Sequence, residues 1–307
     1  MEFKVINLFV QKEGTGLVIK INKMCSRIDT IQTKENANNR EVFDIEVKGV
    51  EDIGLNKKGE LTTKWNPNNA RFHYSNVYKL SYTKEKLVEL MELATVINVE
   101  EVKINRIDIA TDSKMDFVEN AKLIYLLHKC LVAKIKGGKA WNNEDDDDYN
   151  YSSFRFVNRD WRIEFYDKYK ESEGKSLYNT RFEVRHIRVK SQDLVYHIDK
   201  TIDLWNGALN NLDVVEKVQV EKLCKLWDIE KAKCPKLKFT AFVDTYKDKI
   251  LTFGILAKVM KYAGLKCSSK SWLQKYRNTH SIELYSDKDV KRLIKEIVKS
   301  LKEYKKS

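Results

Sequence analysis

The sequence predicts an α+β fold, in which a central antiparallel sheet packed with helices is followed by an all-α C-terminal region. Two observations lead to this prediction. Runs of alternating apolar and polar residues, typical of half-buried strands, recur up to about residue 190 and are interrupted by two helical patterns. Beyond Ser191, every pattern is helical. Strands mixed with helices and then helices alone indicate an α+β domain over residues 1–205 and a helical region over 206–307.

The strands are predicted from β-rich or alternating runs that end at turn or polar residues. In chain order, these runs lie at residues 3–10, 17–21, 41–47, 72–80, 102–112, 151–157, 161–169 and 179–189. A polar stretch at 54–69 is predicted to be a loop.

The helices are predicted from apolar residues that recur at helical spacing. The first covers 82–98, the second is carried by apolar residues within 117–131, and the last covers 286–306. In the last helix, Ser286 and Asp289 resemble a capping box, which marks a helix start. No Gly/Ser- or Pro-rich linker separates the two predicted domains.

The composition describes a globular and basic chain of 307 residues, with 42% hydrophobic residues and a formal net charge of +12. A positive excess favours a polyanionic partner, nucleic acid before membrane, although the base composition of the coding DNA is an equally open explanation for abundant lysine. Five scattered cysteines without a C-x-x-C pair argue against a disulfide scaffold or structural zinc. With no apolar run of about 18 residues and no expected secretion leader, we expect a cytoplasmic protein.

Three predicted strands carry charged side chains on one alternate face and large apolar ones on the other. If these strands are neighbours, the charged side chains form a single open surface. It would hold Arg106, Asp108 and Asp112 from the first strand, Arg162, Glu164, Tyr166 and Lys168 from the second, and Arg181, Glu183 and Arg185 from the third. Such a surface is either the solvent face of a sheet with cross-strand ion pairs or a reactive site.

The order of three short strings favours a reactive site. They are Arg106-Ile107-Asp108-Ile109, Tyr166-Asp167-Lys168-Tyr169-Lys170-Glu171 and Arg181-Phe182-Glu183-Val184-Arg185. Together they resemble the R-[IL]-D, Y-[DN]-K-x-x-E and R-x-E segments of rolling-circle replication initiators. Two related groups share these segments, the Rep proteins of Gram-positive plasmids and the gene II/X replication proteins of filamentous phages. The resemblance covers roughly residues 70–200.

The resemblance implies an origin-specific DNA nickase that initiates rolling-circle replication. Tyr166 would attack the scissile phosphodiester, keep the 5′ phosphate as a phosphotyrosine ester and free a 3′-OH, with Lys168 beside it. Mg²⁺ or Mn²⁺ would polarise the phosphate, with Asp108 and Glu183 as ligands and Asp112 as a third. The DNA contacts expected on this face come from Arg106, Arg162, Arg181 and Arg185.

The C-terminal region is expected to bind DNA or to serve as a scaffold. Residues 269–277 fit the second helix of a helix-turn-helix, with Lys270, Lys275 and Arg277 facing the duplex, and a plain helical bundle remains the alternative. The implied partners are a double-strand origin with a single-stranded or hairpin segment, a host helicase and polymerase, and a second copy of the chain as a homodimer. No membrane partner is expected.

Two other functions stay open. One is a non-enzymatic origin-binding or regulatory protein, and the other is a nuclease that hydrolyses DNA with water and a metal ion held by Asp108 and Glu183. The acidic run at 144–148 is expected to be a solvated insertion, and no P-loop pattern indicates a helicase. Tyr169, the other tyrosine of the motif, is expected in the core because it lies three residues further along a predicted strand.

Overall fold

The computed structural model describes residues 24–37, 50–55, 61–65, 79–81, 83–85, 88, 99–141, 153–266, 270–280 and 284–307. The strands predicted at 3–10, 17–21 and 41–47 lie outside these residues, as do most of the strand predicted at 72–80 and of the helix predicted at 82–98. Within the described residues, the predicted fold class is confirmed, because an antiparallel sheet with packed helices is followed by a helical C-terminal region.

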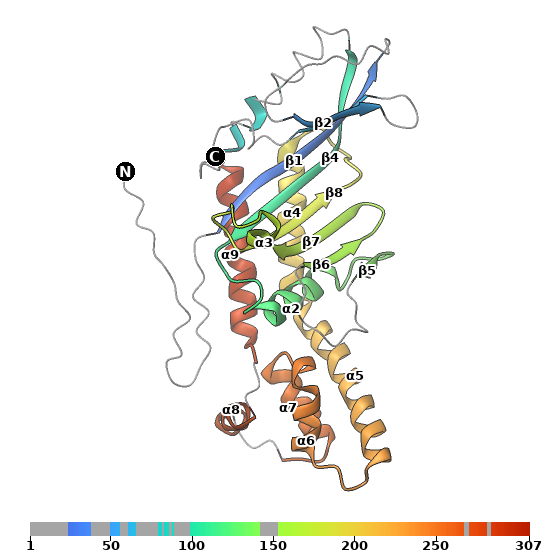
Figure 1. Cartoon of the computed structure of the whole chain (residues 1–307), viewed down its shortest axis with the longest axis vertical. Coiled ribbons are helices and arrows are strands. Elements are labelled where there is room, and N and C mark those ends of the chain that lie inside the picture. The colour runs from blue at the N-terminus through green and yellow to red at the C-terminus, as the bar shows by residue number, and fades with distance from the viewer. Residues whose placement is uncertain are drawn as a thin grey trace, which may run out of the picture. The chain divides into compact units, whose positions relative to one another are not determined.

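The described strands form one sheet of eight in the order β2-β3-β1-β4-β8-β7-β6-β5, and all neighbours are antiparallel (Figure 1). The strands are β1 (Cys25–Ala37), β2 (Val50–Leu55), β3 (Leu61–Trp65), β4 (Val99–Ser113), β5 (Lys139–Trp141), β6 (Ser153–Val157), β7 (Trp161–Asp167) and β8 (Thr180–His186).

Strand β3 and the end of β2 lie within the stretch at 54–69 that the sequence predicted as a loop, and β1 was not predicted. The three strands are rich in polar residues, so they lack the clear apolar alternation that marks a half-buried strand. They form because the long strand β4 offers a partner to β1, which in turn pairs with β3. Tertiary pairing therefore overrides the local pattern here.

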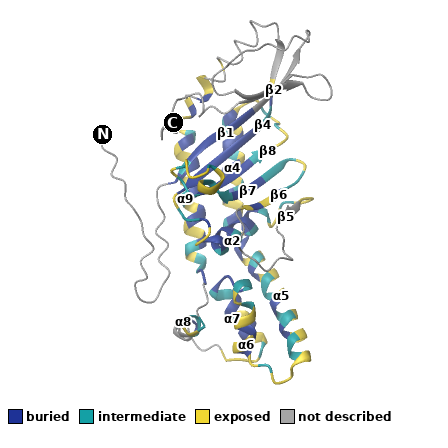
Figure 2. Cartoon of the chain, viewed as in Figure 1, coloured by how far each residue is buried: buried dark blue, intermediate teal, exposed yellow. Residues whose placement is uncertain are grey.

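One face of the sheet carries the apolar core. Phe165 of β7 stacks on Trp205 with ring centroids 5.6 Å apart, and Phe182 of β8 meets the same indole edge to face at 6.1 Å. The last helix, α9 (Asp287–Lys305), contacts β1, because Ser26 Oγ donates to Ser300 Oγ at 2.9 Å. Burial is concentrated along these central strands (Figure 2).

The described helices are α2 (Ala121–Val132), α3 (Lys168–Glu171), α4 (Leu194–Leu209), α5 (Leu212–Lys233), α6 (Phe239–Tyr246), the 3₁₀ turn η1 (Lys247–Lys249), α7 (Phe253–Tyr262), α8 (Lys270–Thr279) and α9 (Asp287–Lys305). Helices α2 and α9 begin and end close to the positions that the sequence predicted, whereas α3 begins inside the stretch 161–169 that was predicted as a strand. The capping box of α9 is confirmed, because Asp289 N donates to Ser286 Oγ at 3.2 Å and Ser286 N donates to Asp289 Oδ2 at 3.3 Å. No described helix is long and apolar enough to cross a membrane.

The chain divides into two compact units, each assembled from separate stretches. A helical unit comprises residues 1–22, 120–134 and 206–295, and a sheet unit comprises 23–119, 135–205 and 296–307. The predicted division at 1–205 and 206–307 differs, because α2 belongs with the later helices. Asn211, at the start of α5, donates to the carbonyl of Cys130 in α2 at 2.8 Å. Whether 1–205 and 206–307 fold as separate domains stays a prediction.

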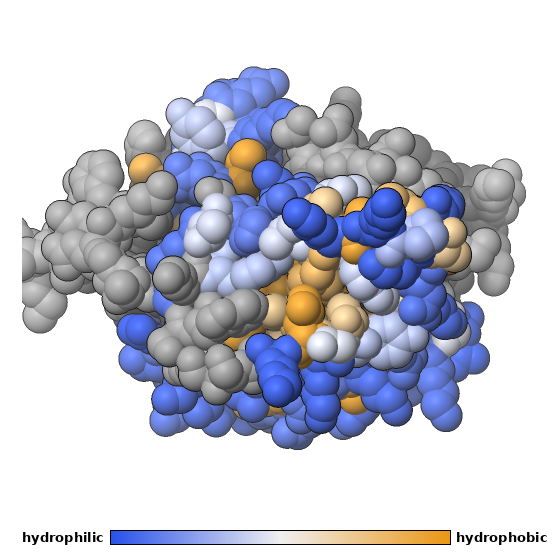
Figure 3. Space-filling model, turned by 90° about the horizontal axis from the view of Figure 1, so that it is seen from below, coloured by the Kyte–Doolittle hydropathy of each residue, from blue (hydrophilic) through white to orange (hydrophobic). Residues whose placement is uncertain are grey.

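The positive charge of the chain belongs to the helical unit. Its residues include 25 Lys and Arg against 12 Asp and Glu, a formal net charge of +13, whereas the sheet unit has 32 against 33, or −1. Figure 3 views the molecule from below, and hydrophilic residues there surround an apolar area. The charge partition matters because a polyanion is attracted mainly by the unit that carries the excess.

Candidate active site

The three charged strands lie side by side in the order β4-β8-β7, which meets the condition under which the sequence predicted a single charged surface. Their charged side chains form three successive cross-strand rows on one face of the sheet. From β7 through β8 to β4, the rows are Tyr166–Arg181–Asp112, Glu164–Glu183–Ala110 and Arg162–Arg185–Asp108. The apolar side chains between them point into the core, so the alternation seen in the sequence is the alternation of the two faces.

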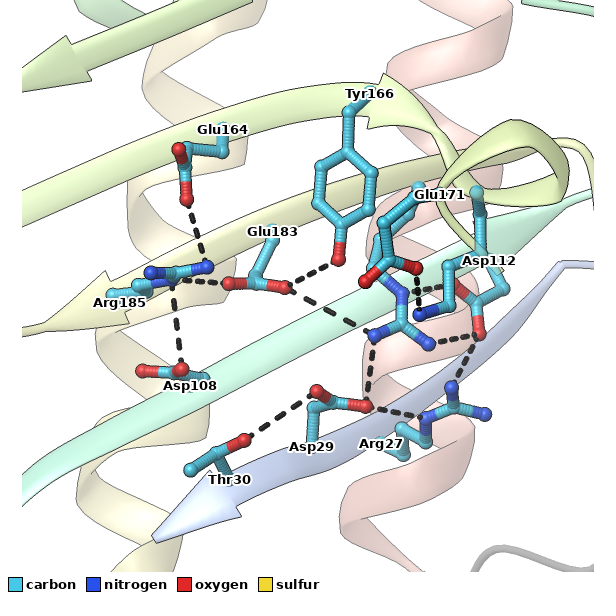
Figure 4. Close-up of polar contacts among 12 residues, drawn as sticks. Arg27, Asp29, Thr30, Asp108, Asp112, Glu164, Tyr166, Glu171, Glu183 and Arg185 are labelled. Atoms are coloured by element: carbon cyan, nitrogen blue, oxygen red, sulfur yellow. Dashed lines mark hydrogen bonds and ion pairs between the residues drawn. The ribbon is translucent and has the colours of Figure 1, made fainter. Parts of the chain in front are cut away.

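Tyr166 lies at one end of this surface. Its hydroxyl donates a hydrogen bond to Glu183 Oε2 at 3.1 Å, and the Lys168 ammonium lies 5.9 Å from the centre of its ring (Figure 4). Burial raises the pKa of Tyr166 well above its usual value, and the charge of Glu183 raises it further. The phenol is therefore protonated at neutral pH, and Glu183 is the group in contact with its proton.

Glu183 is buried and has two neighbours of opposite influence. Burial and the charge of Asp108 together raise the pKa of this carboxyl to about 7, although Arg185 opposes the shift. Arg185 Nε is in direct contact with Glu183 Oε1 and lies 3.5 Å from Asp108 Oδ2. Glu183 thus lies between the phenol of Tyr166 and a guanidinium.

Strand β1 contributes two site residues that sequence reasoning missed, Arg27 and Asp29. A register shift between Ile28 and Thr30 leaves Asp29 without a partner in β4, and the side chain turns to Arg181 Nη1 at 2.9 Å. Such bulges re-aim side chains near functional sites. Burial disfavours the charge of Asp29, but Arg181 and Arg27 hold its pKa below the usual range. The sequence contains a signal, since Arg27-Ile28-Asp29 repeats the Arg-Ile-Asp string of β4.

Arg181 is enclosed by acids instead of facing solvent. Its Nε and Nη2 donate to the two oxygens of Asp112 at 2.7 and 3.1 Å, and its Nη1 reaches Asp29. Arg27 Nη2 contacts the same Asp112 carboxylate at 2.9 Å. Arg181, which the sequence predicted as a DNA contact, therefore acts as a buried link between β8, β4 and β1 in this arrangement.

The three predicted metal ligands do not converge. Asp108 and Glu183 lie together with Arg185 between them, whereas Asp112 is engaged by Arg27 and Arg181. Among the described residues, no group of three His, Cys, Asp or Glu side chains could hold a metal ion. A divalent cation at Asp108 and Glu183 would have to displace Arg185, so the set as arranged does not fit such an ion. The metal requirement stays a prediction.

A second part of the surface is rich in arginine and centres on Glu164. Arg155 of β6, Arg162 of β7 and Arg185 of β8 all contact its carboxylate. Arg162 was predicted as a site residue, and Arg155 was missed because its strand carries no other charged side chain. Arg106 instead pairs with Asp108, to which its Nε donates at 2.8 Å.

The connection after β7 places the second tyrosine of the motif outside the core. Asp167 caps the short helix α3 by accepting from Lys170 N at 2.8 Å, so the strand ends before Tyr169. Tyr169 is 52% exposed, and its predicted core position is wrong. Lys168 opens α3 and pairs with Glu171 at 2.5 Å.

The predicted DNA-binding residues of the C-terminal region lie on α8, which follows α7 in the helical unit. Arg277 stacks over the ring of Phe253, with 6.0 Å from its guanidinium carbon to the ring centre. The backbone of Lys270 and Lys275 is helical, and the placement of their side chains lies outside what the structure describes. The helix-turn-helix arrangement of α7 and α8 stays a prediction.

Comparisons with known proteins give limited information. No protein-family model matches the sequence, and no curated protein matches it. Among solved structures, the chain is similar to the rolling circle replication initiator protein from Geobacillus stearothermophilus, with a TM-score of 0.31 and 14% identity over 57% of this chain and 78% of that chain. At this identity and TM-score, the similarity does not assign a chemistry to the site.

Proposed function

We propose that the chain is a DNA-nicking and strand-joining protein that initiates rolling-circle replication through a 5′-phosphotyrosine at Tyr166. The observation that carries the proposal is the hydrogen bond from the Tyr166 hydroxyl to Glu183, on a sheet face lined with arginines. A tyrosine nucleophile needs a partner for its proton and positive charge near the phosphate. Both lie within this surface.

The proposed reaction exchanges one phosphodiester for another. The Tyr166 oxygen forms a bond to the phosphorus, the bond from phosphorus to the 3′ oxygen breaks, and that oxygen leaves as a 3′-OH. Glu183 is placed to take the phenol proton, and the 3′ oxygen gains one proton in return. The ester bond is kept in the protein, so rejoining by the reverse reaction needs no other energy source.

The helical unit supports a role in DNA binding. Its net charge of +13 would attract duplex DNA, while the nearly neutral sheet unit would contact one strand through its charged face. On this proposal, the duplex origin is bound by the helical unit and the nicked strand by the sheet unit. The free 3′-OH would then serve a host polymerase with a host helicase, in the cytoplasm.

A trapped protein–DNA adduct tests the proposal. The full chain is incubated with a supercoiled plasmid carrying its own coding region and flanks, in Mg²⁺ or Mn²⁺, and then denatured and digested with nuclease. We expect a nicked circle and a covalent nucleotide on the peptide that contains Tyr166. Nicked DNA without any adduct would indicate hydrolysis by water instead.

A non-enzymatic DNA-binding protein is the second candidate. The specific observation in its favour is that Asp108, Asp112 and Glu183 are each paired with arginine, as expected for a surface held together by ion pairs. Specific binding to the same plasmid with neither nick nor adduct would favour this candidate.

A further inference from the structure

Three guanidinium groups share the single carboxylate of Glu164. Arg162 Nη2 lies 2.9 Å from Oε1, Arg185 Nη2 lies 2.7 Å from Oε2, and Arg155 Nε contacts Oε1. These three arginines come from three adjacent strands, β7, β8 and β6. Together the four side chains make a cluster, named here the Glu164 cluster, in which one negative charge faces three positive ones.

The sheet register adds repulsion between two arginines of the Glu164 cluster. Arg162 and Arg185 are direct cross-strand partners, and like charges in that position repel each other. Each guanidinium has five N–H donors, so the three groups together offer about fifteen. The carboxylate of Glu164 can accept hydrogen bonds from only some of these donors. Arg162 Nε has no acceptor among the described residues. The cluster is therefore short of acceptors and of negative charge.

The shortage is local to this end of the charged face. The end near Tyr166 is balanced, because its three basic groups face three acids, namely Arg27, Lys168 and Arg181 against Asp29, Asp112 and Glu171. The other end has four arginines and three acids, namely Arg106, Arg155, Arg162 and Arg185 against Asp108, Glu164 and Glu183.

The unbalanced end is also the accessible one. The side chains of Arg155 and Arg162 are 45% and 33% exposed, whereas that of Arg181 is 2% exposed. The excess charge therefore lies where a ligand can reach it. Planar guanidinium groups match the oxygens of a phosphate, and two neighbouring groups can bind one phosphate from different sides.

We propose that Arg155, Arg162 and Arg185, held together by Glu164, bind a phosphate of a single DNA strand other than the scissile one. Glu164 lies one cross-strand row from Tyr166, and Arg162 lies one row further. Each row is about 6.8 Å along the strand, so the bound phosphate belongs to a nucleotide close to the cleavage point. This inference rests on the proposed function for the identity of the ligand, and it assigns a task to Arg155 that the sequence did not indicate.

Salt dependence of binding tests the cluster without any chemistry. Fluorescence anisotropy of labelled oligo(dT) is measured against NaCl concentration with the full-length Tyr166→Phe protein, and with the same protein carrying Arg155→Gln or Arg162→Gln. Replacing both arginines is expected to reduce the log–log slope by about 0.7 in total, the value for one lost phosphate contact on a single strand, and each single substitution is expected to give part of that reduction. Arg159→Gln is the matched control, because Arg159 lies in the turn between the same strands, is 70% exposed and pairs with Asp160.

A neutral linkage identifies the phosphate. A series of oligo(dT) strands is used, each anchored at one end by a hairpin and each carrying one neutral methylphosphonate linkage at a different position. We expect the linkage to weaken binding to the Tyr166→Phe protein at one position only. The same position should have no further effect once Arg155 and Arg162 are replaced. Thermal unfolding of each variant verifies that the fold is retained.

The outcomes separate this inference from the proposed function. If Arg155→Gln and Arg162→Gln leave the salt slope unchanged, as the Arg159→Gln control should, the cluster does not bind phosphate, even if wild-type protein forms the adduct. If the slopes fall as expected but wild-type protein forms no adduct, the phosphate site is supported and the nicking proposal fails. Absence of any salt-dependent binding to oligo(dT) also overturns the inference.

Discussion

Arg181 and Asp112 form a buried two-bonded ion pair across strands β8 and β4, with Arg181 Nε 2.7 Å from Asp112 Oδ1. The side chains are 2% and 1% exposed, so solvent screens them little. They belong to the same cross-strand row as Tyr166. The charged face thus combines a firmly paired interior, which fixes the strands, with partly exposed groups at its edge.

Loss of the Asp112 charge should destabilise the fold. Asp112→Asn leaves Arg181 and Arg27 buried with one carboxylate fewer, and breaking a buried pair from one side costs about 3–5 kcal/mol. Glu171→Gln removes an exposed carboxylate that pairs with Lys168, and it should cost less than about 1 kcal/mol. Urea unfolding of both variants measures the difference. An Asp112→Asn protein as stable as wild type would mean that the pair contributes little.

Divalent metal should be needed for adduct formation but not for DNA binding. We expect EDTA to stop the adduct. A metal ion at Asp108 would first have to displace Arg185, so Asp108→Asn is expected to raise the Mn²⁺ concentration needed for half-maximal adduct, because an amide oxygen is a weaker ligand than a carboxylate. Adduct yield across a Mn²⁺ titration provides the measurement. An unchanged metal dependence in Asp108→Asn would leave this carboxylate as a partner of Arg106 and Arg185 only.

A glycine in the helical unit has no room for a side chain. Gly254, in the first turn of α7, lies against the buried Glu216, and an added Cβ would come within 2.8 Å of both carboxylate oxygens. Glu216 is fixed by Thr252 and by Lys258 Nζ at 3.1 Å, so it cannot easily move. Gly254→Ala should therefore destabilise the protein by about 1–3 kcal/mol.

Gly207 in α4 provides the matched control, because an added Cβ there meets nothing within 4 Å. Gly207→Ala should be neutral or stabilise by up to about 1 kcal/mol, the usual difference in helix propensity. Thermal unfolding of the two variants compares them directly. Equal effects at both positions would contradict the close contact between α7 and Glu216.

Stability should fall in mild acid because of a buried histidine pair. His186 Nδ1 lies 3.0 Å from His197 Nδ1, and its Nε2 lies 2.9 Å from Thr201 Oγ1. Burial, together with the neighbouring His197, lowers the pKa of His186 to about 3. The folded state favours neutral His186, so this contribution is complete above pH 6.5 and is lost as the pH falls towards 3.

By linkage, the loss should reach about 2 kcal/mol at pH 5 relative to pH 8. His186→Gln should flatten this part of the pH profile measured by urea unfolding. A profile for His186→Gln as steep as that of wild type would assign the acid sensitivity to other groups.

The central strands and their charged face could be predicted from the sequence because period-two alternation is strong in β4, β7 and β8. His186 follows the charged Arg185 along β8 and is buried, as this alternation requires. Strand β1 could not be predicted, because its contribution depends on pairing with β4 and on a bulge at Asp29. Tyr169 was misplaced because the Asp167 cap ends the strand, which the alternation alone does not indicate.

The ion pairs of the site also could not be predicted from the sequence. Residue types on one face do not specify which carboxylate each guanidinium contacts, and that depends on strand order and register. Asp112 shares a strand face with Asp108 and was therefore grouped with it as a metal ligand. In the sheet, Asp112 forms ion pairs with Arg181 and Arg27, whereas Asp108 forms one with Arg185.

The covalent adduct of Tyr166→Phe, compared with that of Tyr169→Phe, tests the central claim most directly. Both substitutions remove one hydroxyl, but only Tyr166 donates to Glu183, whereas Tyr169 lies on the exposed helix α3. We predict that Tyr166→Phe abolishes the adduct and nicking while retaining DNA binding, and that Tyr169→Phe retains all three. Full adduct formation by Tyr166→Phe, or its loss in Tyr169→Phe, would contradict the assignment of the nucleophile.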